Sequence, residues 1–422
     1  MRACIRRGSE EIGGSCIELE SQGKRLILDL GLPLDVRPEA VVDLPHIDGL
    51  GGGDASLLGI VISHSHPDHY GLVPNVHPSV PVYLGQATQQ ILKEAMFFSP
   101  MGADLHAAAY LVDRRELSIG PFTVTPYLVD HSAFDAYALL VEADGDRLFY
   151  SGDLRAHGRK PKAFRNLVDD PPSRVDALLL EGTTIGRPHD TGAAASEADV
   201  EERCVSLFAQ TEGMILAAYS GQNIDRLVTM HRAAKRSGRT LVVDLYTAAI
   251  AKAAGHPSIP QGEWESVHVF VPLSQRIRVK HAEEFDRVSA VRSRRLFPED
   301  VAARAGELVM TFRGSMTRDL QRAECLDGAR CVWSMWAGYL AGPSGVRLRE
   351  WLDRNEISLS VIHASGHAPV TDLQRLSRAI GARAVVPIHT VESARYPDLF
   401  ENVVARRDDE WWPVGAASNP HD

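Results

Sequence analysis

Cysteine is scarce in this sequence. The 422 residues include five cysteines (Cys4, Cys16, Cys204, Cys325 and Cys331), an odd number with no Cys-x-x-Cys pair. Such a scattered set argues against a disulfide framework and against a thiolate zinc motif, and it favours a reducing compartment. Any metal chemistry is therefore expected to rest on histidine and carboxylate side chains.

Long apolar runs are absent as well. No segment approaches 18 consecutive uncharged apolar residues, and residues 1–8 lack the apolar core of a secretory signal. The sequence thus predicts no membrane-spanning helix. Together with the cysteine content, this leads us to expect a cytoplasmic protein.

Positive charge is in deficit overall. The chain has 45 Lys and Arg against 55 Asp and Glu, a net charge of −10, which argues against a protein that holds nucleic acid by its overall charge. The deficit is uneven, because residues 226–330 contain 18 basic and 12 acidic side chains, a net charge of +6 that leaves −16 on the remainder. A basic segment of this kind fits either a phosphate-binding surface or an ordinary solvated one.

The pattern of expected elements changes twice along the chain. Residues 1–190 read as strands and loops, residues 191–355 alternate between helix and strand in the manner of a parallel α/β unit, and residues 356–422 return to strands that end in histidine. The length suffices for two domains. We expect a first domain of residues 1–190 completed by residues 356–422, with residues 191–355 inserted as a second domain.

The densest group of candidate ligands follows a mostly apolar strand over residues 57–62. His64, His66, Asp68 and His69 place four donors within six positions. Imidazole and carboxylate donors suit Zn²⁺ or a similar divalent ion. In an extended loop His64 and His66 share a face, and Asp68 and His69 can turn toward a second position. The alternative interpretation is a histidine-rich surface loop without metal.

Other carboxylates and histidines also follow apolar strands. Ligands delivered from several strand ends to one edge of a sheet form a preorganised metal site. Asp29 is a candidate for orienting a ligand from behind, although it also fits a residue that merely starts a loop. The strand-end residues outside the dense group are Asp29, His131, Asp153, Glu181 and His389.

These residues together resemble a known family. The order Asp29, His64-x-His66-x-Asp68-His69, His131, Asp153 resembles the metallo-β-lactamase fold of metal-dependent hydrolases. The resemblance implies an α/β fold: an αββα sandwich with an inserted β-CASP α/β domain. Glu181, His367 and His389 are similar to the three further motifs of the β-CASP nucleases, and the segments most similar to ribonuclease J are residues 11–14, 180–184, 223–226 and 363–367.

The resemblance implies a two-metal centre. His64, His66 and His131 would hold one ion and Asp68, His69 and His389 the second, with Asp153 bridging the pair. Zn²⁺ is the first expectation and Mn²⁺ the alternative. His367 would protonate the leaving oxygen or bind phosphate, and Glu181 would position His367 unless it forms a surface ion pair instead. With Asp68, these two are the expected catalytic residues.

Small residues at loop–helix junctions are candidates for substrate binding. Ser365 and the backbone N–H of Gly366 stand at the entrance to a helix, where a phosphate is favourably held, and His363, which begins the ribonuclease J-like segment, is a further candidate for substrate binding. Ser220 and Asn223 offer the same arrangement in the second domain. Plain turn formation is the alternative for all of them. The expected partner is single-stranded RNA, with DNA as the alternative; homo-oligomerisation stays open.

The chain departs from the ribonuclease J pattern at three places. Thr390-Val391 stands where the family has Gly-Glu, Gly314-Ser315-Met316-Thr317-Arg318 replaces Gly-Ser-Gln-Gly-Glu, and no residues correspond to the additional C-terminal domain. These departures leave dimerisation and the mode of RNA handling open, and they do not touch the expected metal chemistry. Competing hypotheses are a hydrolase of a small ester, thioester or phosphodiester, a DNA-directed nuclease, and a nucleic-acid binder that has lost catalysis.

Overall fold

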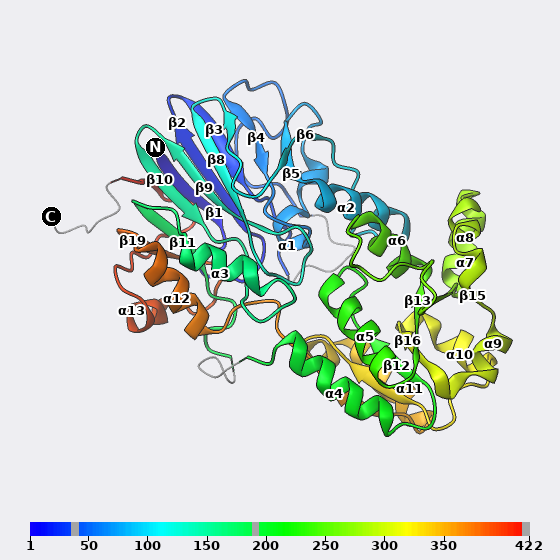
Figure 1. Ribbon diagram of the computed structural model, residues 1–422. Helices are drawn as coiled ribbons and strands as arrows, with labels where there is room; N and C mark the ends of the chain where they lie inside the picture. Colours follow the sequence, from blue (N-terminus) through cyan, green and yellow to red (C-terminus); the bar gives the residue numbers. More distant parts are fainter. Residues whose placement is uncertain (35–41, 188–193, 416–422) are drawn as a thin grey trace. The chain divides into compact units, whose positions relative to one another are not determined.

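The computed structural model describes residues 1–34, 42–187 and 194–415. They form two compact units (Figure 1). The sandwich unit comprises Met1–Met96, Met101–Ala194 and Gly366–Asp422, and the inserted unit comprises Phe97–Pro100 and Ala195–Ser365. Among the described residues, no helix combines the length and apolarity needed to cross a membrane. All five cysteines are buried and unbonded.

Two sheets face each other in the sandwich unit (Figure 1). In the order of hydrogen-bonded neighbours, the first sheet consists, within the described residues, of β20 (Trp411–Pro413), β1 (Arg2–Arg7), β2 (Cys16–Ser21), β3 (Lys24–Leu28), β4 (Leu57–Val61), β5 (Val82–Gly85) and β6 (Ala107–Leu111). The second sheet likewise consists of β19 (Ala384–Ile388), β11 (Ala177–Glu181), β10 (Asp146–Tyr150), β9 (Tyr137–Ala143), β8 (Phe122–Leu128) and β7 (Leu117–Ile119).

The core between the sheets comes from alternate residues of both. Leu19 and Leu26 of the first sheet pack with Leu139 and Leu179 of the second, as expected for side chains that alternate between the two faces of a strand. β11 is buried along its whole length because it lies between the parallel strands β10 and β19. A strand covered on both faces reads as a continuous apolar run, which explains the sequence Ala-Leu-Leu-Leu before Glu181.

Helices cover the outer faces of both sheets. Apolar residues of α1 (Pro67–Tyr70) and α2 (Gln86–Phe98) pack on the outer face of the first sheet. α3 (Pro161–Asp169) and α12 (Val370–Ile380), with α13 (Tyr396–Leu399), cover the second sheet, where Phe164 and Leu373 meet Leu178. The αββα sandwich expected from the sequence is confirmed.

The inserted unit is a parallel sheet with helices on its faces (Figure 1). Its described strands, in order of neighbours, are β15 (Arg295–Leu296), β14 (Val267–Phe270), β13 (Thr240–Asp244), β16 (Leu308–Thr311), β12 (Ile215–Ala218), β17 (Arg330–Trp333) and β18 (Ser358–Val361). Its described α-helices are α4 (Glu197–Ala209), α5 (Ile224–Arg236), α6 (Leu245–Ala253), α7 (Leu273–Ala282), α8 (Asp286–Ser289), α9 (Pro298–Ala303), α10 (Thr317–Arg322) and α11 (Pro343–Arg354). The expected α/β insertion is therefore present.

The expected boundary at residues 355/356 differs from the observed one. β18 pairs in parallel with β17, with Cys331 opposite Leu359, so the strand predicted to begin the return to the first domain instead completes the sheet of the inserted unit. The sandwich unit resumes at Gly366. The other expected boundary, at residues 190/191, lies outside the described residues.

Candidate metal centre

Five strands of the sandwich unit end at one edge, and their ends and the segments that follow them carry all of the predicted donors except His367, which precedes α12. β10, β11 and β19 run parallel in register, with Tyr150 opposite Leu179 and Glu181 opposite Ile388. Residues that follow these strands therefore emerge side by side. β4 and β8 end at the same place, because potential ligand atoms from their loops lie together with those of the other strands. The convergent donors are His64, His66, Asp68, His69, His131, Asp153, Glu181, His367 and His389.

Three histidines and Asp153 form the first group. His66 Nδ1 lies 3.2 Å from His64 Nε2 and 3.1 Å from His131 Nε2. Asp153 Oδ2 is 3.7 Å from His64 Nε2 and 3.9 Å from His131 Nε2. All four ligand atoms lie within 4.8 Å of one another, so one divalent ion can contact them together after small rotations of the rings.

Asp153 also belongs to the second group, with Asp68, His69 and His389. His389 Nε2 is 3.3 Å from Asp68 Oδ2, and His389 Nδ1 is 3.4 Å from Asp153 Oδ1. His69 Nε2 lies 3.2 Å from Asp153 Oδ2. These residues come from α1 and from the ends of β10 and β19, and all of them are buried. Asp153 is thus the donor that the two groups share.

The unsatisfied polar atoms of the site fit a bound cation. Both carboxylate oxygens of Asp153 and Nε2 of His69 are buried, and the described residues provide none of them with a well-formed hydrogen bond. A buried carboxylate that accepts no well-formed hydrogen bond is costly. Histidine and carboxylate donors at this density are the ligands that divalent transition metals prefer, and metal coordination would satisfy all three atoms. The residues present therefore fit the implied ions.

Asp29 supports the centre from behind. It follows β3, is fully buried, and accepts a hydrogen bond from Nδ1 of His69 at 2.7 Å. It also accepts from the backbone N–H and the hydroxyl of Ser63, both at 2.7 Å, and from the hydroxyl of Tyr150 at 2.8 Å. A carboxylate on one ring nitrogen directs the lone pair of the other nitrogen toward a metal. His69 Nε2 is accordingly left facing Asp153.

Two more ligand rings are held by other partners. Nδ1 of His131 donates to the carbonyl oxygen of Gly366 at 2.6 Å, which leaves its Nε2 for the first donor group. Nδ1 of His389 lies 2.9 Å from the hydroxyl of Thr183. Gly366 therefore has a role that differs from the expected one: within the sandwich unit its carbonyl orients a ligand ring. The expected role of its N–H stays a prediction.

Glu181 is buried beside His367. Its side chain is fully inaccessible to solvent and lies 3.1 Å from Nδ1 of His367 through Oε2. Glu181 Oε1 accepts from the backbone N–H of Leu154 at 2.9 Å, next to Asp153. The alternative interpretation of Glu181 as a surface ion pair is therefore wrong, because the residue closes β11 at the buried edge.

The electrostatics of the site divide its histidines into two kinds. Burial and neighbouring imidazoles hold the pKa values of His64 and His131 well below 6.5, and burial lowers the pKa of His66 to about 4. Burial also disfavours a charged His69, but the carboxylates of Asp153, Asp29 and Asp68 outweigh it and raise the His69 pKa well above 6.5. Neutral imidazole is the metal-binding form, so the first group is ready for a cation, whereas His69 has to release its proton before it can coordinate one.

Neighbouring charges also favour the charged forms of Asp153, Asp68 and His367. Despite burial, nearby His389 and His69 hold the pKa of Asp153 well below its usual value. Burial likewise opposes ionisation of Asp68, but His69 and His389 lower its pKa to about 2. Burial lowers the pKa of His367. The negative charges of Glu181 and Asp153 raise it by more than burial lowers it, so the pKa lies above its usual value.

Unusual backbone angles mark the same edge. Asp29 and His389 adopt left-handed conformations, with φ of 57° and 54°, which cost about 1 kcal/mol or more outside glycine and persist where the surroundings enforce them. Gly31 allows the loop after β3 to pass close to α1, because a Cβ at this position would lie 1.7 Å from the carbonyl oxygen of Asp68. The first-sheet loops are thus tightly fitted against α1.

The remaining predicted residues lie in the inserted unit. Asn223 caps α5 by accepting from the backbone N–H of Arg226 at 2.9 Å, so its side-chain oxygen is already used for helix capping. Ser220 is exposed in the turn before α5. Arg226 reaches the segment that carries His363 and Ser365, with its Nη1 3.5 Å from Nδ1 of His363. These four residues therefore occupy one region of the inserted unit.

Several supporting residues were not predicted from the sequence. Asp130 and Arg155, which flank the ligands His131 and Asp153, form a fully buried ion pair with Nε 3.4 Å from Oδ1. Thr183 contacts His389, and Tyr150 contacts Asp29. Their positions at or just beyond strand ends were visible, because Tyr150 closes β10 and Thr183 follows β11. Which distant residue each of them contacts has no signature in the local sequence.

Comparisons with known proteins agree with this geometry. Residues 51–232 match the model of the Beta-lactamase superfamily domain. Ribonuclease J of Sinorhizobium meliloti is 22% identical over 390 residues, covering 86% of this chain and 63% of the relative. Ribonuclease J of Mycobacterium tuberculosis is 22% identical over 412 residues, covering 92% and 68%. The chain thus spans about two thirds of the length of these relatives.

A solved structure shares the fold. A protein of unknown function from Enterococcus faecalis V583 superimposes with a TM-score of 0.78 at 20% identity, covering 97% of this chain and 99% of that one. By its fold and by its matched domain, the chain has a metallo-β-lactamase fold into which an α/β unit is inserted. Over most of its length it resembles ribonuclease J, as its sequence motifs predict.

Proposed function

We propose that the chain is a two-metal hydrolase that cleaves phosphodiester bonds of RNA. The observation that carries this proposal is Asp153, whose two buried oxygens lack hydrogen bonds and lie between two groups of histidine and carboxylate donors. The ribonuclease J relatives support RNA as the substrate. Unpaired cysteines and an RNA substrate both fit the cytoplasm.

Two sets of residues would hold the ions. His64, His66 and His131 would bind one, and Asp68, His69 and His389 the other, with Asp153 shared. Zn²⁺ suits the donors best, and Mn²⁺ is the alternative. A metal pair in such a site supplies a water of lowered pKa and positive charge that stabilises an in-line displacement at phosphorus.

The chain's own residues prepare the site for that chemistry. Asp29 and the carbonyl of Gly366 hold His69 and His131 by their Nδ1 atoms, so that each ring presents Nε2. Rings fixed in this way need no reorganisation when substrate binds. Burial of the donors excludes bulk water, which strengthens every charge interaction in the site.

His367 is proposed as the proton donor to the leaving oxygen. Its Nδ1 contacts Glu181, so Nε2 is the ring nitrogen available to substrate. Glu181 positions His367 and at the same time holds the backbone beside Asp153. Because His367 follows Ser365 and Gly366 directly, a phosphate bound at that turn would stand next to the proton donor.

The direct test is cleavage of defined substrates with added Zn²⁺ or Mn²⁺. We expect the purified protein to cleave single-stranded RNA, and comparison of 5′-monophosphorylated with 5′-triphosphorylated RNA would define its end requirement. Asp68→Ala and His69→Ala should abolish cleavage while folding survives, whereas His77→Ala, at an exposed histidine outside the donor groups, should behave as wild type. Unchanged activity in the first two variants would refute the proposal.

Parallel substrates separate the alternatives. Preference for single-stranded DNA would assign the chain to the DNA-directed nucleases. Turnover of a generic phosphodiester without cleavage of RNA would favour a hydrolase of small substrates. His367→Ala should lower the cleavage rate much more than the content of bound metal, and an equal loss of both would exclude its role as proton donor.

A further inference from the structure

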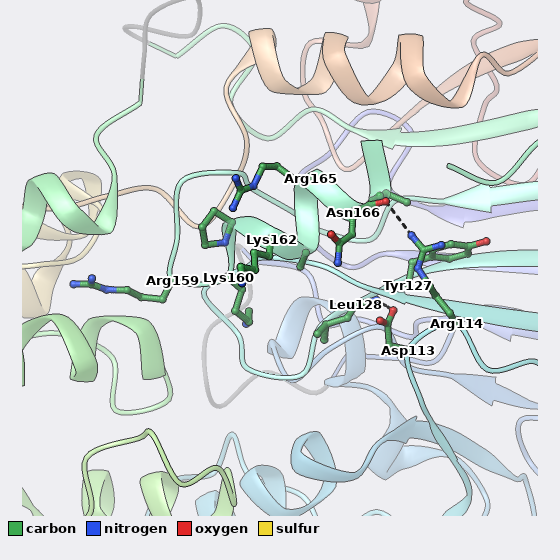
Figure 2. Close-up of a pocket in the computed structure, with 12 residues that line it drawn as sticks. Asp113, Arg114, Tyr127, Leu128, Arg159, Lys160, Lys162, Arg165 and Asn166 are labelled. Atoms are coloured by element: carbon green, nitrogen blue, oxygen red, sulfur yellow. Dashed lines mark hydrogen bonds between the residues drawn. The ribbon is translucent and has the colours of Figure 1, made fainter. Parts of the chain in front are cut away.

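A basic pocket opens in the sandwich unit between α3 and the strands beside it (Figure 2). Its volume is about 460 Å³. Segments far apart in sequence form its walls: residues 113–114, residues 127–128 at the end of β8, and residues 159–167 at the start of α3. None of these residues belongs to the donor groups of the metal centre.

Five of the twelve residues that line it are basic, although acidic residues outnumber basic ones in the chain as a whole. The only acidic residue among those that line it is Asp113, and the basic ones are Arg114, Arg159, Lys160, Lys162 and Arg165. Like charges brought together in a recess repel one another, and a concave site focuses their field. The pocket is therefore suited to a multivalent anion.

Some of these cations are fixed by protein contacts. Arg114 pairs with Asp170 at 2.5 Å and lies over the ring of Tyr127, 5.1 Å from its centroid. Lys160 donates to the carbonyl oxygen of Ala133 at 3.4 Å and lies over Phe134. Figure 2 shows Arg114 close to Tyr127 and Asn166, with the basic residues of the α3 segment along another part of the lining.

Lys162 and Arg165 differ from these. Both are exposed on the first turns of α3, and no side-chain ion pair or hydrogen bond joins either of them to another described residue. α3 begins with Pro161 and has no side chain capping its N-terminus, so the helix dipole adds to the positive field. Two unneutralised cations beside a recess form a surface that an external anion can occupy.

The pocket is linked to the metal centre through the chain. Lys160 contacts Ala133, two residues after the ligand His131. Arg159 follows Asp153 by six residues, at most about 20 Å of extended chain. The loop that carries Asp153 therefore also supplies Arg159 and Lys160 to the lining of the pocket, and Lys160 holds the loop that carries His131.

We propose that this pocket binds backbone phosphates of the single-stranded nucleic acid at a distance from the scissile bond. The inference rests on the proposed function and adds a second point of contact with the same substrate. Lys162 and Arg165 supply charge to the phosphates, and Arg114, held over Tyr127, lines the recess. Contacts to the backbone give affinity without dependence on sequence.

The test is a salt titration of binding. Anisotropy of a fluorescein-labelled oligouridylate of about 12 nucleotides, measured with chelator present to prevent cleavage, compares wild type with K162Q/R165Q. The control is K24Q/R383Q, which removes the same charge. Its two positions lie at the starts of β3 and β19, whereas Asp29 and His389 of the metal centre follow the other ends of these strands.

The expected result follows from counterion release. Loss of two phosphate contacts should reduce the slope of log affinity against log salt by about 1.4 and weaken binding by about tenfold at about 0.1 M salt. K24Q/R383Q should retain the wild-type slope. Equal slopes and affinities in all three proteins would overturn the inference.

Catalysis provides an independent readout. If K162Q/R165Q raises KM for long RNA while hydrolysis of bis(p-nitrophenyl) phosphate is unchanged, the pocket acts in substrate binding alone. If wild type cleaves RNA and the variant cleaves it equally well with equal affinity, only the pocket assignment fails. If no protein cleaves RNA but the variant alone loses oligonucleotide affinity, the proposed function fails and the pocket assignment stands.

Discussion

At the residue scale, three of the five ligand histidines illustrate how a partner outside the set of ligands holds one ring nitrogen. Asp29 holds His69, the carbonyl of Gly366 holds His131, and Thr183 lies beside His389. A ligand held in this way has a fixed tautomer and orientation, and removal of such a partner lowers metal affinity by about 10- to 100-fold in known sites.

Asp29→Asn should therefore weaken metal binding without preventing folding. We expect the dissociation constant for Zn²⁺ to rise by about 10- to 100-fold, because the carboxylate that accepts from Nδ1 of His69 is replaced by an amide. Competition with a chromophoric chelator measures this. Asp176→Asn is the control, since Asp176 lies at the opposite end of β11 and accepts from the backbone of Arg147; equal affinities in both variants would contradict the role of Asp29.

The sequence predicts the donors better than their supports. The donors follow strands whose apolar patterns are visible, so their convergence on one edge could be expected before any coordinates. The contacts of Thr183 and Tyr150 depend on which loops meet across the two sheets, and no local pattern encodes that pairing. Asn223 is a residue for which the motif predicts substrate binding, although its side-chain oxygen is used to cap α5. The motif alone does not reveal this capping role.

At the element scale, the short helix α1 carries Asp68 and His69 and is fitted against the loop that follows β3. Leu30 and Leu32 donate backbone hydrogen bonds to His69 and Pro67 at 2.8 and 2.9 Å. Gly31, between them, leaves no room for a side chain. The position of two metal ligands therefore depends on a residue that is not a ligand.

Gly31→Ala should disturb the metal centre. A Cβ 1.7 Å from the carbonyl oxygen of Asp68 forces α1 to move, and we expect at least about tenfold lower metal affinity or a loss of about 1–3 kcal/mol of stability. Chelator competition and urea unfolding measure the two effects. Gly51→Ala is the matched control, because a Cβ there meets nothing within 4 Å. Wild-type behaviour of Gly31→Ala would show that the close contact is not needed.

In the inserted unit, Asp244 joins three elements. It ends β13, caps α6 through the backbone N–H of Thr247, and pairs with Arg313 after β16, with Nε 2.6 Å from Oδ2. Burial opposes its ionisation, but Arg313 and the hydrogen bonds from Thr247 outweigh burial and lower its pKa below 3.8. The ionised form therefore stabilises the fold.

This lowered pKa predicts an acid-sensitive contribution to stability. The contribution is complete above the unfolded-state pKa, about 3.9, and is lost as pH falls through the lower folded-state pKa. At neutral pH, Asp244→Asn should cost about 3 kcal/mol, and this difference from wild type should shrink below about pH 4. Urea unfolding at several pH values measures it. A difference that stays constant down to pH 2 would contradict the assignment.

The boundary near residue 356 shows what limits a prediction of elements. The first of the strands expected in residues 356–422 is present as Ser358–Val361, but periodicity does not say which sheet a strand joins. Its exposed and half-buried residues fit an edge strand of either sheet. Pairing with β17 decides its place, and that pairing depends on long-range contacts.

At the scale of the whole molecule, the two units have separate cores and different relations to metal. The donor groups lie entirely in the sandwich unit. A ligand that binds only the folded state stabilises the unit that binds it, by about 4 kcal/mol at a thousandfold excess over its dissociation constant.

Removal of metal should therefore affect one unfolding transition. We expect calorimetry to resolve two transitions, of which chelation lowers only that of the sandwich unit, by several degrees. Asp244→Asn should lower the other. A chelation shift shared equally by both transitions, or absent from both, would contradict the confinement of the metal centre to one unit.

Charge is also distributed on this scale. The basic segment found in the sequence, residues 226–330, lies in the inserted unit, whereas the basic pocket beside α3 lies in the sandwich unit and was hidden within a region of net negative charge. Counts along the chain average over side chains that folding separates. Nucleic-acid contacts are thus better inferred from surfaces than from segments.

The metal content of the purified chain tests the central claim most directly. Mass spectrometry of elements in carefully prepared protein should find about two divalent ions per chain in wild type and clearly fewer in Asp153→Asn with an unchanged circular dichroism spectrum. A wild-type protein without such ions after incubation with Zn²⁺ or Mn²⁺, or an Asp153→Asn variant that retains both, would contradict the account.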